Sequence, residues 1–212
     1  MREPFLLINF KTYEQSTGKN AVILAKKICK LNKNISIAPQ FADINQISKI
    51  CKNVFAQHVD GIGFGRNTGH VLAESLKQAG AIGSLINHSE RRIGIKEIES
   101  AVKACKRAKL ISVVCVPDVK TAIKVDQMKP DYVAIEPPEL IETGIAVSKA
   151  KPKVITNTVK NVNTKVICGA GISNGDDVKI AFELGTVGVL VSSAVVKSER
   201  PEKVLKEMIK YV

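Results

Sequence analysis

The chain has 212 residues, of which 45% are hydrophobic and 25% are charged, which suffices for one sizeable core. No apolar run approaches the about 18 residues that a membrane span needs, so no membrane association is expected. The net charge of +12 favours anionic partners, but the lysines are spread along the chain and aromatic residues make up only 4%, so no nucleic-acid partner is expected.

Short β-branched runs alternate with helical patterns from one end of the chain to the other. Several runs are almost continuously apolar, which is typical of parallel strands buried on both faces. In chain order, the predicted strands are 5–9, 35–39, 53–57, 81–86, 111–116, 131–136, 165–170 and 187–192.

Helical signals fill the intervals between these runs. Asn174 is expected to cap one helix, which Gly185 ends, and Pro201 fits the first turn of the last helix. Apolar residues at spacings of three and four predict one buried helical face, formed by Ile95, Ile98, Val102, Cys105 and Ala108.

Eight strand–helix units fit either a closed barrel or a doubly wound open sheet. The number of strands favours a (β/α)₈ barrel. The length lies near the lower limit for that fold, about 200 residues, so some helices are expected to be shortened. No linker or change of composition interrupts the pattern, and residues 1–212 are expected to form a single domain.

The chain has an odd number of cysteines and no CxxC pair. This pattern predicts neither a disulfide framework nor a zinc site, and it favours buried free thiols and a cytoplasmic location. The five cysteines are Cys29, Cys51, Cys105, Cys115 and Cys168.

Polar residues follow five of the predicted strands, where parallel α/β folds gather their chemistry. They bring a cation, an imidazole and a carboxylate to one rim, together with two turns whose backbone N–H groups suit an anion. These strand-end residues are Asn9, Lys11, His88, Glu136, Gly171, Ser192 and Ser193.

Each of these side chains also has a purely structural interpretation. Lys11 fits a surface lysine, and Glu136 fits a cap at the end of its strand. Arg91 and Arg92 are expected to form structural ion pairs. For His88, which follows the fourth predicted strand, spacing alone leaves both a structural and a functional interpretation open.

Other motifs exclude common cofactor sites. His58 and His70 are twelve residues apart, which matches no usual zinc spacing, so no metal is expected. The glycine-rich segments 61–65 and 169–175 both lack the last glycine of GxGxxG, which disfavours a dinucleotide.

Taken together, these segments resemble the triosephosphate isomerase family, especially its short archaeal members. The resemblance implies a (β/α)₈ barrel of the TIM type and an isomerase of three-carbon sugar phosphates that needs no cofactor. The segments that carry it are NFK (9–11), INHSERR (86–92), AIEPPELI (134–141), TG (143–144), CGAGIS (168–173) and GVLVSSAVVKS (188–198).

The same resemblance assigns roles to single residues. Glu136 resembles the family's catalytic base, His88 its electrophile and Lys11 its electrostatic stabiliser. His88 is expected at the N-terminus of a short helix, whose dipole would favour the neutral ring. Lys11 is expected to have a neighbouring residue in the pocket. Asn9 is that neighbour, and Glu90 resembles a supporting carboxylate. Substrate-binding positions are implied for a further group, namely Asn9, Lys11, Ile141, Gly144, Gly171, Ser192 and Ser193.

The resemblance also implies a mobile lid and a homo-oligomer. Ile141 and Gly144 lie in the lid segment, where Glu142 departs from the family's usual glycine. Thr68 resembles a loop tip that inserts into a partner subunit. Family members are dimers or tetramers, and the resemblance to archaeal members favours a tetramer. The alternatives are another phosphate-binding barrel enzyme, a basic nucleic-acid-binding protein, and an inactive barrel kept for assembly.

Overall fold

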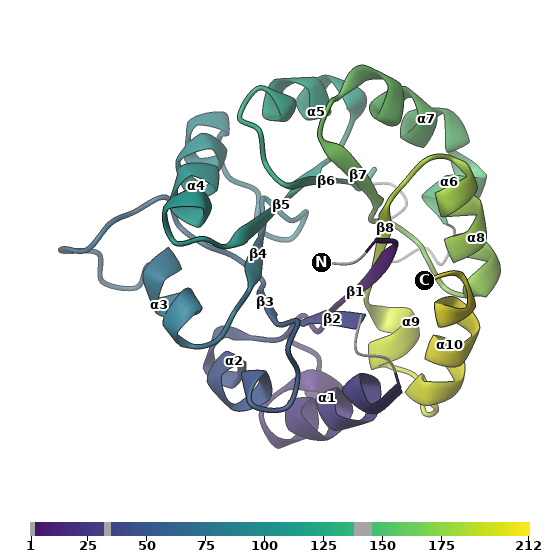
Figure 1. Ribbon diagram of the computed structural model, residues 1–212, viewed down its shortest axis with the longest axis horizontal. Helices are drawn as coiled ribbons and strands as arrows, with labels where there is room; N and C mark the ends of the chain where they lie inside the picture. Colours follow the sequence, from purple (N-terminus) through teal and green to yellow (C-terminus); the bar gives the residue numbers. More distant parts are fainter. Residues whose placement is uncertain (1–2, 32–34, 138–145) are drawn as a thin grey trace.

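The computed structural model describes residues 3–31, 35–137 and 146–212, and these residues form one sheet of eight parallel strands. A bridge between Ile37 and Val54 joins the two end strands and completes the ring seen in Figure 1. The expected closed barrel is therefore confirmed. The strands are β1 (Phe5–Asn9), β2 (Ile35–Ala38), β3 (Phe55–Ala56), β4 (Gly83–Ile86), β5 (Ile111–Val116), β6 (Tyr132–Ile135), β7 (Lys165–Cys168) and β8 (Gly188–Val191).

Helices form the outer layer of the barrel (Figure 1). The expected shortening is confirmed, because α3 has six residues and α6 and α9 have four each. The helices are α1 (Lys19–Leu31), α2 (Phe41–Ser48), α3 (Ala73–Gln78), α4 (Ile95–Arg107), α5 (Val119–Asp126), α6 (Val147–Ala150), α7 (Pro152–Asn161), α8 (Gly175–Glu183), α9 (Ser193–Val196) and α10 (Pro201–Met208).

The predicted helix signals are confirmed with one exception. The Asn174 side chain accepts a hydrogen bond from the backbone of Asp177 at the start of α8, and Gly185 follows its end with φ 95°. Pro201 is the first residue of α10. Ile95 was expected in the core but is 44% exposed, because it begins α4 and the buried face starts only at Ile98.

The strands are apolar on both faces because they separate two cores. Leu7 points into the barrel interior, whereas Leu6 and Ile8 pack against the helices outside. At the amino-terminal end of the strands, the Tyr132 hydroxyl donates to Glu3 at 2.8 Å, and the Lys165 ammonium lies 2.9 Å from the same carboxylate. These contacts hold the chain before β1 against β6 and β7.

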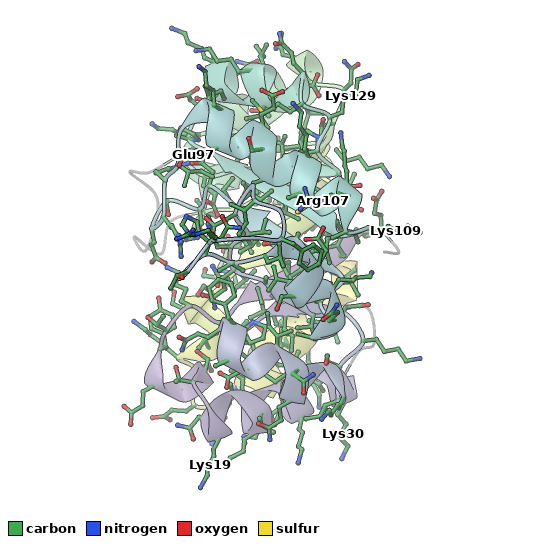
Figure 2. The ribbon with its side chains drawn as sticks, turned by 90° about the vertical axis from the view of Figure 1, so that its left-hand side faces the viewer. Lys19, Lys30, Glu97, Arg107, Lys109 and Lys129 are labelled. Atoms are coloured by element: carbon green, nitrogen blue, oxygen red, sulfur yellow. A yellow bond between two sulfur atoms is a disulfide. The ribbon has the colours of Figure 1, made fainter. Side chains whose placement is uncertain are left out.

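The positive charge is spread over the surface. Figure 2 shows Lys19, Lys30, Lys109 and Lys129 projecting outward from well-separated places on one side of the molecule. Within the described ranges, no helix combines the length and apolar character needed to cross a membrane.

The prediction of five free thiols is wrong. Cys29 in α1 and Cys51 after α2 form a disulfide with their Cα atoms 5.8 Å apart. Cys105, Cys115 and Cys168 are free and buried, as expected. The pair has no motif spacing, and it forms because α1 and α2 pack side by side on the barrel (Figure 1).

We expect the disulfide to stabilise the fold measurably. It closes a loop with a sequence separation of 22, for which loss of chain entropy in the unfolded state contributes about 3 kcal/mol. Reduction should lower the melting temperature by roughly 6–12 °C, as measured by circular dichroism with and without reductant. The Cys29→Ser/Cys51→Ser double variant is the control, and reductant should not change its melting temperature. An unchanged melting temperature of wild type after addition of reductant would contradict the prediction.

Candidate active site

The strand-end residues that were predicted from the sequence surround one cavity of about 290 Å³ at the carboxyl end of the barrel. Glu90 does not line this cavity and lies at its edge, in contact with Lys11. Ile141 and Gly144, like Glu142, lie outside the described residues. The residues of the expected set that line the cavity are Asn9, Lys11, His88, Glu136, Gly171, Ser192 and Ser193.

Lys11 reaches the cavity by a turn and not by strand periodicity. The strand β1 ends at Asn9, and Lys11 adopts a left-handed backbone with φ 48°. The Asn9 side chain accepts a hydrogen bond from the Lys11 backbone at 3.0 Å. The Lys11 side chain is largely buried, and its ammonium forms an ion pair of 2.8 Å with Glu90. A cation is thereby fixed beside the cavity.

His88 follows β4, and its two ring nitrogens have different surroundings. Its Nδ1 accepts a hydrogen bond from the backbone N–H of Glu90 at 3.2 Å. An accepting Nδ1 carries no proton, so the neutral ring has its N–H at Nε2. That nitrogen lies 3.8 Å from Oε1 of Glu136. The ring therefore directs a hydrogen-bond donor toward the cavity and the carboxylate.

The expected helix N-terminus at His88 is absent from the structure. Residues 87–94 form a turn, and the next helix, α4, begins only at Ile95. The expected helix dipole therefore does not act at His88. The N–H of Glu90 instead selects the tautomer of the ring, because it can bond only to an Nδ1 that carries no proton.

Glu136 follows β6 and is 1% exposed. Burial raises the pKa of its carboxyl group. Among the described residues, Oε2 has no hydrogen-bond partner. A Cβ at position 169 would lie 2.4 Å from Cγ of Glu136, so the glycine leaves the space that this side chain occupies. Glu136 is thus a buried carboxylate with a raised pKa beside the cavity, which suits a group that takes up a proton.

Two turns form the opposite wall of the cavity. Gly171, after β7, has φ 72°, a conformation that glycine adopts without strain. Ser192 and Ser193 connect β8 to the start of α9, and the Ser192 hydroxyl donates to the backbone oxygen of Asn9 at 2.8 Å. Turns of this kind present backbone N–H groups to anions. One side of the cavity thus carries ionisable side chains, and the other is formed by turns whose backbone N–H groups suit an anion.

Other candidate residues have structural contacts. His58 lies 3.0 Å from Asp60, whose other carboxylate oxygen accepts from the backbone of Val71. Arg92 was expected in an ion pair, but its guanidinium donates to the backbone oxygen of Asn87 at 3.1 Å. The contacts of Asp60 hold the loop after β3, and the Arg92 contact holds the turn that carries His88.

Sequence reasoning gave no role to Gly169 and Asn87. Gly169 lies against Glu136, and Asn87 has φ 60° directly before His88. Asparagine is among the few non-glycine residues that tolerate this conformation, which was the available signal for a special position.

Known proteins resemble this chain along nearly its whole length. The family model described as triosephosphate isomerase matches residues 4–212. Triosephosphate isomerase of Methanosarcina mazei is 47% identical, over 100% of both chains, and that of Methanothermus fervidus is 48% identical over 99% of both. The crystal structure of triosephosphate isomerase from Bartonella henselae matches with a TM-score of 0.73 at 20% identity, covering 91% of this chain and 93% of that one.

Proposed function

The chain belongs to the triosephosphate isomerase family and is an isomerase, and we propose that it interconverts dihydroxyacetone phosphate and D-glyceraldehyde 3-phosphate through an enediolate. The observation that carries this proposal is the meeting of Lys11, His88 and Glu136 at one cavity of about 290 Å³. The reaction serves glycolysis and gluconeogenesis.

The proposed mechanism assigns one task to each of the three groups. The carboxylate of Glu136, which lines the cavity, removes a proton from one substrate carbon and returns it to the next. The Nε2–H of His88 donates to the two substrate oxygens in turn, and the Lys11 ammonium stabilises the negative charge that develops there. A glutamate base and a neutral histidine are the established pair of this family. No cofactor takes part in these steps.

The substrate phosphate is proposed to bind the opposite wall. The turns at Gly171 and at Ser192–Ser193 provide backbone N–H groups there. Binding energy from this non-reacting group positions the three carbons between Glu136 and His88. The lid with Ile141 and Gly144 stays a prediction, and it lies outside the described residues.

A coupled assay with glyceraldehyde 3-phosphate tests the proposal. Wild type is expected to turn over the substrate, and Glu136→Gln is expected to lose nearly all activity. Inactive wild type would favour another phosphate-binding barrel or a barrel kept for assembly. Salt-dependent retention on DNA, with a slope that implies several phosphate contacts, would favour the nucleic-acid-binding alternative.

As the pH is lowered, kcat/KM should begin to fall while the pH is still above 4.5, the ordinary pKa of a glutamate. Burial favours the neutral carboxyl group and so raises the pKa of Glu136. The base is active only when ionised, so kcat/KM should fall as the pH decreases through this raised pKa. A profile of kcat/KM against pH measures this fall. Full activity down to pH 4.5, on enzyme shown to be folded, would contradict the assignment.

We also propose that the chain forms a homo-oligomer through the loop 57–72, which projects from the barrel in Figure 1. Arg107 in α4 anchors the loop by donating to the backbone oxygen of Ile62 at 2.6 Å. Beyond this anchor, Phe64 is 79% exposed and Thr68 is exposed. A hollow of about 220 Å³ beside the active site offers a second copy a place for this tip.

Light scattering on wild type and on Phe64→Glu tests the homo-oligomer. Wild type is expected to be a dimer or tetramer, and Phe64→Glu to shift it toward monomer. Monomeric wild type would contradict this proposal and leave the isomerase proposal standing.

The whole chain is proposed to act as one catalytic domain in the cytoplasm, where phosphorylated sugars are retained by their charge. The Cys29–Cys51 disulfide removes the thiol argument for a reducing compartment, so this location rests on the substrate. Fractionation of the source cells tests it.

A further inference from the structure

Asn87 occupies a demanding position at the end of β4. It is 4% exposed and has φ 60°, a conformation that L-residues with a side chain rarely adopt. His88, the proposed electrophile, follows it directly. The left-handed backbone at Asn87 therefore determines the direction in which the chain leaves the strand and presents the imidazole.

The Asn87 side chain connects two separate segments. Its Nδ2 donates to the backbone oxygen of Cys115 in β5 at 2.8 Å. Its Oδ1 accepts from the backbone N–H of Ile93 at 2.9 Å. One amide group thus ties the first residue of the 87–93 turn to the neighbouring strand and to the last residue of the same turn.

The catalytic histidine and its orienting group both lie inside this tied turn. His88 is its second residue, and the N–H that bonds to Nδ1 belongs to Glu90, its fourth. The Arg91 N–H also donates to the His88 backbone oxygen at 2.8 Å. A turn released at its base would change the position of the imidazole and of the N–H that selects its tautomer.

We propose that Asn87 is a positioning residue whose amide side chain holds the 87–93 turn, so that His88 presents Nε2–H to the substrate. This inference rests on the proposed role of His88. Glycine adopts a φ of 60° without steric cost. If only the backbone conformation mattered, glycine would serve equally well at position 87. Glycine cannot form the two side-chain hydrogen bonds of Asn87.

The Asn87→Gly and Asn87→Asp variants test this role. Glycine keeps the backbone conformation and removes both bonds. Aspartate keeps the shape and the acceptor for Ile93, and it replaces the donor to Cys115. Both variants are expected to lower kcat by at least about tenfold with KM within about twofold, because small displacements of a catalytic group have large effects on the chemical step.

The imidazole ¹⁵N spectrum of His88 gives a readout that a merely structural role would not move. Wild type should show one neutral tautomer, with the proton on Nε2, and Asn87→Gly should show a mixture. A wild-type His88 spectrum in Asn87→Gly would overturn the inference, and so would wild-type kcat in both variants.

Asp126 offers a matched control at the other end of the barrel. Its carboxylate accepts from the backbone N–H groups of Asn163 and Thr164, at 3.1 and 2.8 Å, and so ties the turn before β7. Asp126→Ala should lower the melting temperature and leave kcat within about twofold; a tenfold loss there would remove the specificity claimed for Asn87. Full activity in His88→Ala would overturn the proposed function, whereas the spectrum of Asn87→Gly decides the inference on the turn by itself.

Discussion

Glu136→Asp should lower kcat by more than tenfold while the fold and the melting temperature stay close to those of wild type. Removing one methylene withdraws the carboxylate by about 1 Å, and a misplacement of that size costs on the order of 10²-fold in rate. The shorter side chain keeps the charge and the burial, so the loss reports geometry and not ionisation. Steady-state kinetics in the coupled assay measures the effect.

The control for this change is Glu183→Asp in α8, where the same methylene is removed from an exposed carboxylate. Its turnover should equal that of wild type. Glu136 is the candidate base because no other carboxylate lines the cavity within the described residues. Wild-type kcat in Glu136→Asp would rule out this role.

Lys11→Ala should remove nearly all activity and leave the barrel folded. The ammonium is the cation fixed at the cavity wall, and loss of one preorganised electrostatic group typically costs 10²–10³-fold in kcat. Its partner Glu90 is about half exposed, with 52% of its side chain accessible, so water can solvate that carboxylate after the change. Kinetics measures activity, and circular dichroism checks the fold.

Lys30→Ala is the matched control, since it removes the same charge from a surface lysine labelled in Figure 2. Its activity should be unchanged. Substantial activity in Lys11→Ala would show that the developing charge is stabilised by the backbone and His88 alone.

The fold was predictable because each strand is buried on both faces. Alternate residues such as Leu6 and Leu7 face different apolar cores, and this yields the continuous apolar runs that mark parallel strands. The shortest strand, Phe55–Ala56, was predicted as 53–57, because sequence shows which residues are apolar but not how many of them pair with a neighbour.

The convergence of the strand-end residues on one cavity was predictable, and their local geometry was less so. A closed parallel barrel brings every strand's carboxyl end to one rim, so His88 and Glu136 meet there although they are far apart in the chain. The turn at Lys11, with φ 48°, and the N–H of Glu90 on His88 depend on local backbone geometry that residue spacing does not specify. The Cys29–Cys51 disulfide depends on how two helices pack, which the spacing of the cysteines also leaves open.

The single bridge between Ile37 and Val54 makes β2 and β3 the seam of the barrel, whereas β1 and β2 pair at four positions. Local opening of the sheet should therefore begin at this seam. The Ile37 N–H donates to the backbone oxygen of Asn53 across the seam, so amide hydrogen exchange at Ile37 would report the opening. The two helices on either side of β2 carry or precede Cys29 and Cys51. The covalent tether thus spans the least paired part of the ring and limits how far an opening there can spread.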